Sequence, residues 1–253
     1  MARKNKTDEV IKEFVYDTFS HDKTVERYTD DTIKIGLWES EKEMIKKHFK
    51  VSDSILDLGC GTGRTTFGLH QMGYKNVIGV DLIPSMVENA IKNNRAFGSD
   101  ISFEVGDAMN LRFENEQFDA CLFSFNGIMQ IPLQKNRIIA MKEIHRVLKK
   151  GGIFLFTTHD REINEEWFPF WEDEKNKWEK GEQDPRLFEF GDRIVEEKYR
   201  LVYLHFPNQK EMKEAMKESG FHLIETIPST DVAKEPEHIL ERISPCRFWV
   251  FRK

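Results

Sequence analysis

Short apolar runs alternate with amphipathic segments between residues 54 and 158. Each run has the length and the β-branched or aromatic content of a strand, and the five runs are SILDLGC, NVIGVD, ISFEVGD, FDACLFSF and IFLFTTH. Between them, helical spacing predicts helices over residues 62–72, 84–95 and 133–148. Because alternating strands and helices form a parallel sheet covered on both faces, we expect a doubly wound α/β fold. Such sheets bind ligands at the carboxyl ends of their strands.

The segments that flank this region follow other patterns. Residues 1–50 are polar with apolar positions near helical spacing, and we expect an N-terminal helical cap there. Helical spacing over 207–219 and the runs FHLIETI and CRFWVF predict one more helix and two more strands, which complete the sheet within 206–253. We therefore expect one domain over residues 1–253, with its core at 51–158.

Residues 159–205 interrupt the alternation of strands and helices. This stretch combines charged residues with aromatic residues between Trp167 and Phe190, and it ends in the strand-like run YRLVYLHF. We interpret it as an insertion over the sheet. Its aromatic side chains either form a lid that contacts an apolar or cationic ligand, or pack the insertion onto the domain.

Composition and charge narrow the classes of protein. The chain has 253 residues, 39% hydrophobic and 32% charged, as in soluble globular proteins. Its net charge of −6 disfavours a nucleic-acid partner, because phosphate-binding surfaces carry a basic excess. No run reaches the ~20 apolar residues of a membrane span, and the amino terminus lacks the apolar core of a secretory signal. Neither metal-ligand spacing nor a disulfide framework relates Cys60, Cys121 and Cys246. We therefore expect a cytoplasmic protein without a metal or a membrane partner.

A glycine-rich turn follows the first predicted strand, in the segment Leu56–Arg64. Glycines leave such a turn without side chains, so that a ligand can approach the backbone. The spacing of Gly59, Gly61 and Gly63 is G-x-G-x-G, whereas the dinucleotide fingerprint is G-x-G-x-x-G. Asp57, just before the turn, would repel a pyrophosphate and favour a cationic amino group. S-adenosylmethionine (SAM), which carries an ammonium, a sulfonium and no phosphate, meets these requirements.

Two more carboxylates follow the next two strands. Asp81 closes the run NVIGVD, where it can accept hydrogen bonds from both hydroxyls of a ribose, in NAD as well as in SAM. Asp107 follows the third strand, where it can accept from an adenine amino group. Each aspartate alone is also compatible with a helix cap or a turn. The combination with the glycine turn is what indicates a nucleoside site.

With these features in place, the segment from Ile55 to Thr158 resembles the class I SAM-dependent methyltransferases. The resemblance covers about two-fifths of the chain, and it extends to the glycine pair in the run KKGGIFL. It implies a Rossmann-like sheet of seven strands, mostly parallel, with helices on both faces and an antiparallel last strand, for which CRFWVF is the candidate.

The resemblance also implies SAM as the cofactor. The positions that match Asp57 and the three loop glycines hold its methionine part, the position of Asp81 holds its ribose, and that of Asp107 its adenine. We expect further contacts from residues beside these positions, namely Cys60, Leu82, Met86, Ala108, Met109 and Ser124.

The methyl acceptor should lie near the end of the fourth strand, at residues 124–127. The N-P-P-Y-like motif of enzymes that methylate base amino groups is absent there, and Cys121 lacks the Pro-Cys context of enzymes that methylate pyrimidine carbon. Both observations favour a small-molecule acceptor. Asn126 and Gln130 are candidates for orienting it, and His159 is a candidate base or merely a polar strand end. Amines that lose a proton to water need no base.

Three other functions stay open at this point. The chain can be a non-catalytic SAM-binding subunit or a methyltransferase that acts on RNA or protein. A nicotinamide-dependent oxidoreductase is disfavoured by the glycine spacing and by Asp57. The sequence does not indicate an oligomeric state.

Overall fold

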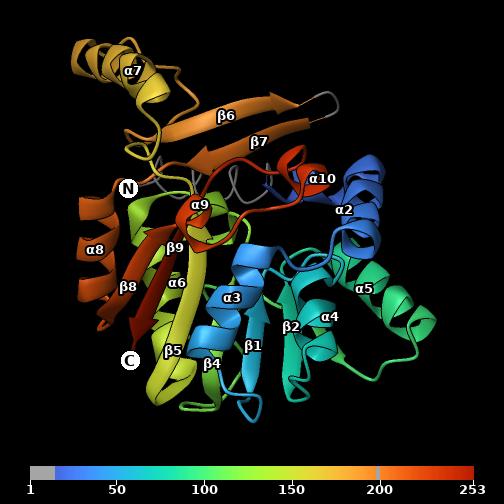
Figure 1. Cartoon of the computed structure of the whole chain (residues 1–253). Coiled ribbons are helices and arrows are strands. Elements are labelled where there is room, and N and C mark those ends of the chain that lie inside the picture. Colours follow the sequence, from blue (N-terminus) through green and yellow to red (C-terminus); the bar gives the residue numbers. More distant parts are fainter. Residues whose placement is uncertain (1–14, 198–199) are drawn as a thin grey trace.

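A seven-stranded sheet forms the centre of the computed structural model, which describes residues 15–197 and 200–253 (Figure 1). The strand order is β3-β2-β1-β4-β5-β9-β8, and all neighbours pair in parallel except that β9 runs antiparallel to β5 and β8. The predicted sheet with its antiparallel last strand is thereby confirmed. Its strands are β1 (Ile55–Leu58), β2 (Val77–Asp81), β3 (Ser102–Val105), β4 (Phe118–Phe123), β5 (Leu148–Thr158), β8 (His222–Pro228) and β9 (Arg247–Arg252).

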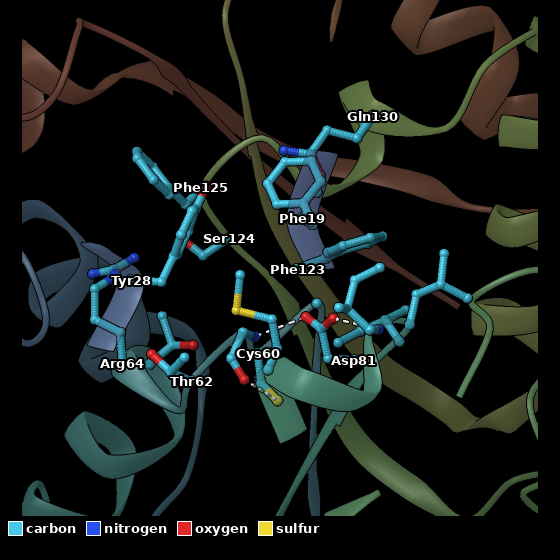
Figure 2. A pocket seen from close by; sticks show the side chains of 18 of the residues that line it. Phe19, Tyr28, Cys60, Thr62, Arg64, Asp81, Phe123, Ser124, Phe125 and Gln130 are labelled. Carbon is cyan, nitrogen blue, oxygen red and sulfur yellow. Dashed lines mark hydrogen bonds between the residues drawn. The ribbon is translucent and has the colours of Figure 1, made fainter. Parts of the chain in front are cut away.

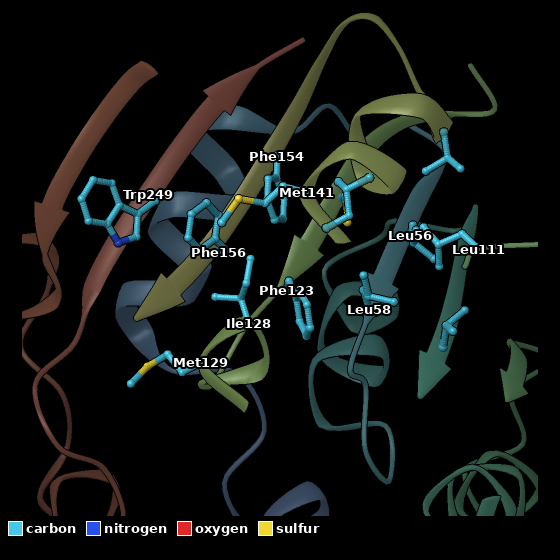
Figure 3. Packing of buried hydrophobic residues seen from close by; sticks show 14 of the residues in the cluster. Leu56, Leu58, Leu111, Phe123, Ile128, Met129, Met141, Phe154, Phe156 and Trp249 are labelled. Carbon is cyan, nitrogen blue, oxygen red and sulfur yellow. The ribbon is translucent and has the colours of Figure 1, made fainter. Parts of the chain in front are cut away.

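Helices cover both faces of the sheet because side chains alternate between the faces along each strand. Leu56 and Leu58 belong to a core that includes residues of α5, α6 and α8, and Figure 3 shows part of this core. Ile55 belongs to the core of the other face, which includes residues of α3 and α4. These helices are α3 (Glu39–His48), α4 (Arg64–Gln71), α5 (Pro84–Ala96), α6 (Gln134–Val147) and α8 (Gln209–Glu218).

Further elements gather at the carboxyl ends of the parallel strands (Figure 1). Residues 15–20 are helical, as are α2 (Asp22–Lys34), α9 (Ser229–Val232) and α10 (Glu237–Leu240), and a 3-10 turn, η1 (Gly127–Gln130), follows β4. The helical pattern expected over 1–50 is therefore present from residue 15 onward. Its first fourteen positions lie outside the described residues.

The insertion holds a hairpin of its own, β6 (Asp192–Glu197) and β7 (Arg200–His205), which forms a separate two-stranded sheet. It also holds the turn η2 (Glu165–Trp167) and the helix α7 (Phe168–Lys180), which projects from the body of the molecule in Figure 1. The sequence pattern indicated β7 but not β6, because β6 has only two apolar residues among charged ones. Val202 and Leu204 of β7 join the core on the α6 face.

A buried cluster of charges attaches this hairpin to the domain. The Nδ1 atom of His205 in β7 is 2.8 Å from a carboxylate oxygen of Asp192. Its Nε2 atom is 2.5 Å from a carboxylate oxygen of Glu211 in α8. Each ring nitrogen of His205 thus lies at hydrogen-bond distance from a carboxylate oxygen. Arg161 also pairs with Glu211, at 3.1 Å, and Arg137 of α6 lies 3.7 Å from it. The cluster thus links the hairpin, α6 and α8 through charge-assisted hydrogen bonds.

Replacing Asp192 with Asn should lower the free energy of unfolding by about 3 kcal/mol at neutral pH, because it removes a buried carboxylate that accepts hydrogen bonds from Tyr203 and from two backbone N–H groups and that lies 2.8 Å from His205. Burial raises the pKa of Asp192, but hydrogen bonds from His205 and Tyr203 outweigh this, and the net shift is downward. The stabilisation from a lowered carboxyl pKa is present above about pH 4 and is lost as the pH falls further. Urea unfolding of the parent protein and of Asp192→Asn should show that their difference in free energy of unfolding shrinks as the pH falls from 7 to 3. Asp173→Asn on the exposed face of α7 is the control; an equal effect of both substitutions would contradict the role of the cluster.

Candidate functional site

A cavity opens at the carboxyl ends of β1 and β4, where the strand order of the sheet reverses (Figure 2). This is the switch point at which doubly wound sheets bind ligands. The loops after β1, β2, β3 and β4 contribute to its lining, and so do residues from the N-terminal helices and from the segment after α10.

The glycine turn after β1 forms the floor of this cavity, and its backbone requires the glycines. Gly59 and Gly63 have φ of +66° and +100°, and a Cβ on either would lie 2.6 Å or less from a phenylalanine ring. Gly61, with φ of +55°, has Tyr28 as its nearest neighbour, and its Cβ would lie 3.7 Å from that ring. Gly59, Cys60 and Gly61 line the cavity, whereas Gly63 supports the turn from outside it.

Asp81 binds the glycine turn to the end of β2. Its Oδ2 accepts a hydrogen bond from the Gly61 backbone N–H at 2.8 Å, and its Oδ1 accepts from the Ile83 N–H at 2.9 Å. Burial raises the pKa of this carboxyl group. Each oxygen retains a lone pair for a further donor, and Asp81 lines the cavity. A ligand with two adjacent hydroxyls suits such a group.

Asp57 lies beneath the turn and does not line the cavity. Alternation along β1 directs it to the face that α4 covers, where its Oδ2 accepts from the hydroxyls of Thr65 at 2.6 Å and Thr66 at 2.5 Å. Its Oδ1 has no hydrogen-bond partner among the described residues. Burial raises the pKa of Asp57 to about 6. The structure therefore gives Asp57 a place under the N-terminus of α4 and not the expected direct place in the cavity.

The remaining positions expected to contact the cofactor all line the cavity. Asp107 begins a turn in which its Oδ1 accepts from the Met109 N–H at 2.8 Å. The hydroxyl of Ser124 donates to Glu41. The others that line it are Leu82, Met86, Ala108 and Met109.

Of the three candidates for acting on the acceptor, only Gln130 lines the cavity. Asn126 has φ of +69° and uses its carbonyl to accept from Met129 at the start of η1. The ring of His159 stacks on Phe206, and its Nδ1 lies 3.1 Å from the Pro245 carbonyl. Burial lowers the pKa of His159. The cavity lining thus gives no support to His159 as a base or to Asn126 as an acceptor contact.

The cover of the cavity differs from the expected aromatic lid. None of the described residues of the insertion lines the cavity. Residues between 15 and 38 cover it instead, together with Arg242 and Ile243 from the segment after α10. The aromatic residues of the insertion contact one another and Phe206, as in the pair of Trp171 and Phe206 at 5.7 Å. These contacts favour the interpretation that the aromatic residues pack the insertion onto the domain over the interpretation that they form a lid.

Sequence reasoning missed a buried ion pair between Arg64 and Glu41. Arg64 begins α4 and holds the two Glu41 oxygens at 2.6 and 2.7 Å, and it also donates to the Gly36 carbonyl. Glu41 in turn accepts from the Trp38 backbone N–H at 2.9 Å. The guanidinium lies over the Trp38 ring, 4.8 Å from its centroid. Arg64 directly follows the glycine turn, but no local pattern identifies its partner on another helix.

Replacing Glu41 with Gln should lower the free energy of unfolding by about 3 kcal/mol, because Arg64 then stays buried without its countercharge. The same change should weaken ligand binding in the cavity, since Arg64 joins the cover to the glycine turn. Chemical denaturation measures the first effect. Glu43→Gln, which breaks an exposed pair with Lys46 on the same helix, should change stability by less than about 1 kcal/mol. Similar losses for both variants would show that the buried pair has no special role.

The raised pKa of Asp57 predicts a dependence of stability on pH. A carboxyl group that titrates near pH 6 in the fold and near 3.8 when unfolded makes folding less favourable as the pH rises through this window. Asp57→Asn keeps an acceptor for the two threonines and removes the titration. Its stability relative to the parent should therefore rise by roughly 2 kcal/mol between pH 4 and pH 7. The measurement is paired urea unfolding at both values, and a difference that is constant with pH would contradict the burial of the charge.

One group of possible metal ligands occurs among the described residues, formed by Glu189, Asp192 and His205. Both nitrogens of His205 already bond to carboxylates, and Arg137 holds Glu189 at 2.7 Å. These side chains form a closed hydrogen-bonded cluster, so the group does not argue for a metal centre. No helix within residues 15–197 and 200–253 has the length and apolar character needed to cross a bilayer.

Comparison with known proteins agrees with this geometry. Residues 55–152 match a methyltransferase domain family. Carboxy-S-adenosyl-L-methionine synthase of Campylobacter curvus is 30% identical over 59% of this chain and 65% of its own length. Demethylmenaquinone methyltransferase of Staphylococcus haemolyticus is 36% identical over 43% of this chain and 44% of its own. The alignments thus span less than two thirds of either relative.

Solved structures share the fold. A SAM-dependent methyltransferase from Methanosarcina mazei superimposes with a TM-score of 0.68 at 20% identity, over 87% of this chain and 99% of that one. A SAM-dependent methyltransferase from Clostridium acetobutylicum superimposes with a TM-score of 0.62 at 17% identity, over 90% of this chain and 96% of that one.

Proposed function

Since this chain belongs to the class I SAM-dependent methyltransferases, we propose that it transfers a methyl group from SAM to a small-molecule acceptor bound in the cavity of Figure 2. The observation that carries the proposal is the joint position of the glycine turn and Asp81 on one cavity inside the matched domain. When bound, SAM supplies a methyl group on a positively charged sulfur.

The residues of the cavity fit this cofactor chemically. Asp81 presents carboxylate lone pairs to a pair of hydroxyls, and Asp107 with Ala108 and Met109 suits an adenine ring. Gly61 leaves its place on the cavity floor without a side chain. The buried carboxyl of Asp57, with one unpartnered oxygen, adds negative potential beneath the turn. That potential favours a cationic ligand and disfavours the pyrophosphate of a dinucleotide.

The chain's contribution to methyl transfer is positioning and exclusion of water. Such positioning can be worth ~7–11 kcal/mol in favourable reactions. The cover from α2 and from Arg242 and Ile243 closes the cavity, and the pair of Arg64 and Glu41 fixes Trp38, which also lines the cavity, next to the glycine turn. His159 does not line the cavity, so we do not assign it as a base; an acceptor that loses its proton to water needs none.

Three observations favour a small acceptor over RNA or protein. The cavity is covered by several elements of the chain, and the overall charge is −6. The two relatives compared above are named for small molecules, carboxy-S-adenosyl-L-methionine and demethylmenaquinone. A non-catalytic SAM-binding subunit is the second candidate, and formation of S-adenosylhomocysteine with any acceptor excludes it.

Calorimetric titration with SAM tests the cofactor assignment. We expect binding to the parent protein and a loss of at least tenfold in affinity for Asp81→Ala, because a charged hydrogen-bond acceptor contributes about 1.5–3 kcal/mol. Asp100→Ala, on an exposed turn, is the control and should bind like the parent. Absence of SAM binding to the parent protein, or binding of NADH that competes with SAM, would overturn the proposal.

A further inference from the structure

The cavity has a second side, opposite Asp81, whose walls are aromatic; two of these rings, Tyr28 and Phe123, also border the glycine turn. Figure 2 shows Phe19, Phe125 and Gln130 on the opposite side of the cavity from Cys60 and Asp81. Edge-to-face contacts connect these rings through Tyr28, which lies 6.1 Å from Phe19 and 6.4 Å from Phe125 between ring centroids. We call Phe19, Tyr28, Phe123 and Phe125 the aromatic wall. Walls of this kind bind flat apolar ligands.

The charged groups next to the aromatic wall are neutralised by one another. The bidentate contact with Glu41 neutralises Arg64, and Arg242 pairs with Asp31 at 2.8 Å. An anionic acceptor would therefore meet no cation that lacks a countercharge in this lining, and it would lie in the same cavity as the carboxylate of Asp81. Burying a charge without a partner is costly, so the lining disfavours an acidic acceptor.

A cationic acceptor is disfavoured for a separate reason. Aromatic rings attract cations through their faces, but three of the four rings of this wall already have guanidinium groups over them. Arg64 lies 5.6 Å from the centroid of Phe125, and Arg200, outside the cavity lining, lies 5.2 Å from Phe19 and 5.6 Å from Tyr28. A cationic ligand would have to compete with Arg200 for the faces of Phe19 and Tyr28.

Gln130 is a polar group that this side of the cavity offers to a neutral ligand. Three hydroxyls of the lining are engaged: Ser124 donates to Glu41, and the hydroxyls of Thr32 and Thr62 lie 2.7 Å apart. The side-chain amide of Gln130 has no hydrogen-bond partner within the described part of the chain, and the side chain is half-buried. A carboxamide can both donate and accept, so it suits a hydroxyl or a carbonyl group.

We propose that the acceptor is an uncharged, planar ring compound that lies against the aromatic wall and whose hydroxyl or carbonyl group is bound by Gln130. Gln130 is thereby a specificity residue that orients the ring, while the wall supplies most of the contact area. The inference rests on the proposed methyltransferase function, since it assigns this side of the cavity to the acceptor.

Four naphthalene derivatives of one shape test the charge preference: 2-naphthol, 2-naphthoate, 2-naphthylmethylamine and naphthalene itself. Each is titrated by ligand-detected NMR into the protein saturated with S-adenosylhomocysteine, and again into the protein alone. At pH 7, 2-naphthol should bind at least tenfold more tightly than the charged analogues. Equal or tighter binding of the naphthoate or the amine would overturn the proposal.

Variants locate the binding and identify the role of Gln130. Gln130→Leu should weaken the binding of 2-naphthol about tenfold, the equivalent of one lost hydrogen bond, and leave the binding of naphthalene unchanged. Phe19→Leu should weaken the binding of both compounds. Gln134→Leu, an exposed glutamine outside the lining, is the matched control and should match the parent. Unchanged naphthol binding in Gln130→Leu, with the parent protein as reference, would contradict the assigned contact.

The two proposals fail separately in this design. If S-adenosylhomocysteine does not bind, the cofactor assignment is wrong, and the titrations into the protein alone still report the ring preference. If S-adenosylhomocysteine binds while the neutral ring shows no preference, only the acceptor class is wrong.

Discussion

The ion pair between Arg64 and Glu41 is the contact on which the rest of the cavity depends. It joins the first residue of α4, directly after the glycine turn, to the helix α3 of the N-terminal region. Through Glu41 the same pair holds the Trp38 backbone and the Ser124 hydroxyl at the end of β4. Floor, wall and cover therefore meet at a single buried charge cluster. Separating the two partners would leave a buried charge without a countercharge, which is costly. The pair therefore favours the one relative position of these segments in which both partners meet.

Charge is distributed unequally between the two sides of the cavity. The side formed by the turns after β1 and β2 has the carboxylate of Asp81 and, beneath it, the buried Asp57. The opposite side has aromatic rings, and the charged residues among its lining are paired with each other or with α3. A cationic donor and an uncharged acceptor are the ligands that this distribution favours. The same asymmetry explains why the turn alone identifies the donor side and says nothing about the acceptor.

The sheet could be predicted from sequence because each strand and helix has a strong local pattern. The apolar runs and the glycine turn required no knowledge of distant contacts, and the antiparallel β9 followed from the family resemblance. The direction of Asp57 was also within reach, since alternation along β1 directs it away from the face of Leu56 and Leu58. The cover of the cavity could not be predicted from the sequence, because the positions of Phe19 and Tyr28 in the lining depend on how the N-terminal helices pack against the domain. Both alternatives for the aromatic insertion, a lid and packing onto the domain, stayed open for the same reason, because its composition fits either one equally well.

Transfer of a labelled methyl group tests the account most directly. The protein is incubated with SAM labelled at the methyl carbon and with a cell extract separated into RNA, protein and small-molecule fractions, the last divided into acidic, basic and neutral compounds. The account predicts that label enters the neutral small-molecule fraction as S-adenosylhomocysteine forms, and that Asp81→Ala lowers both when SAM is below its dissociation constant for the parent protein. Label found in RNA or protein, or SAM binding without transfer to any fraction, would contradict it.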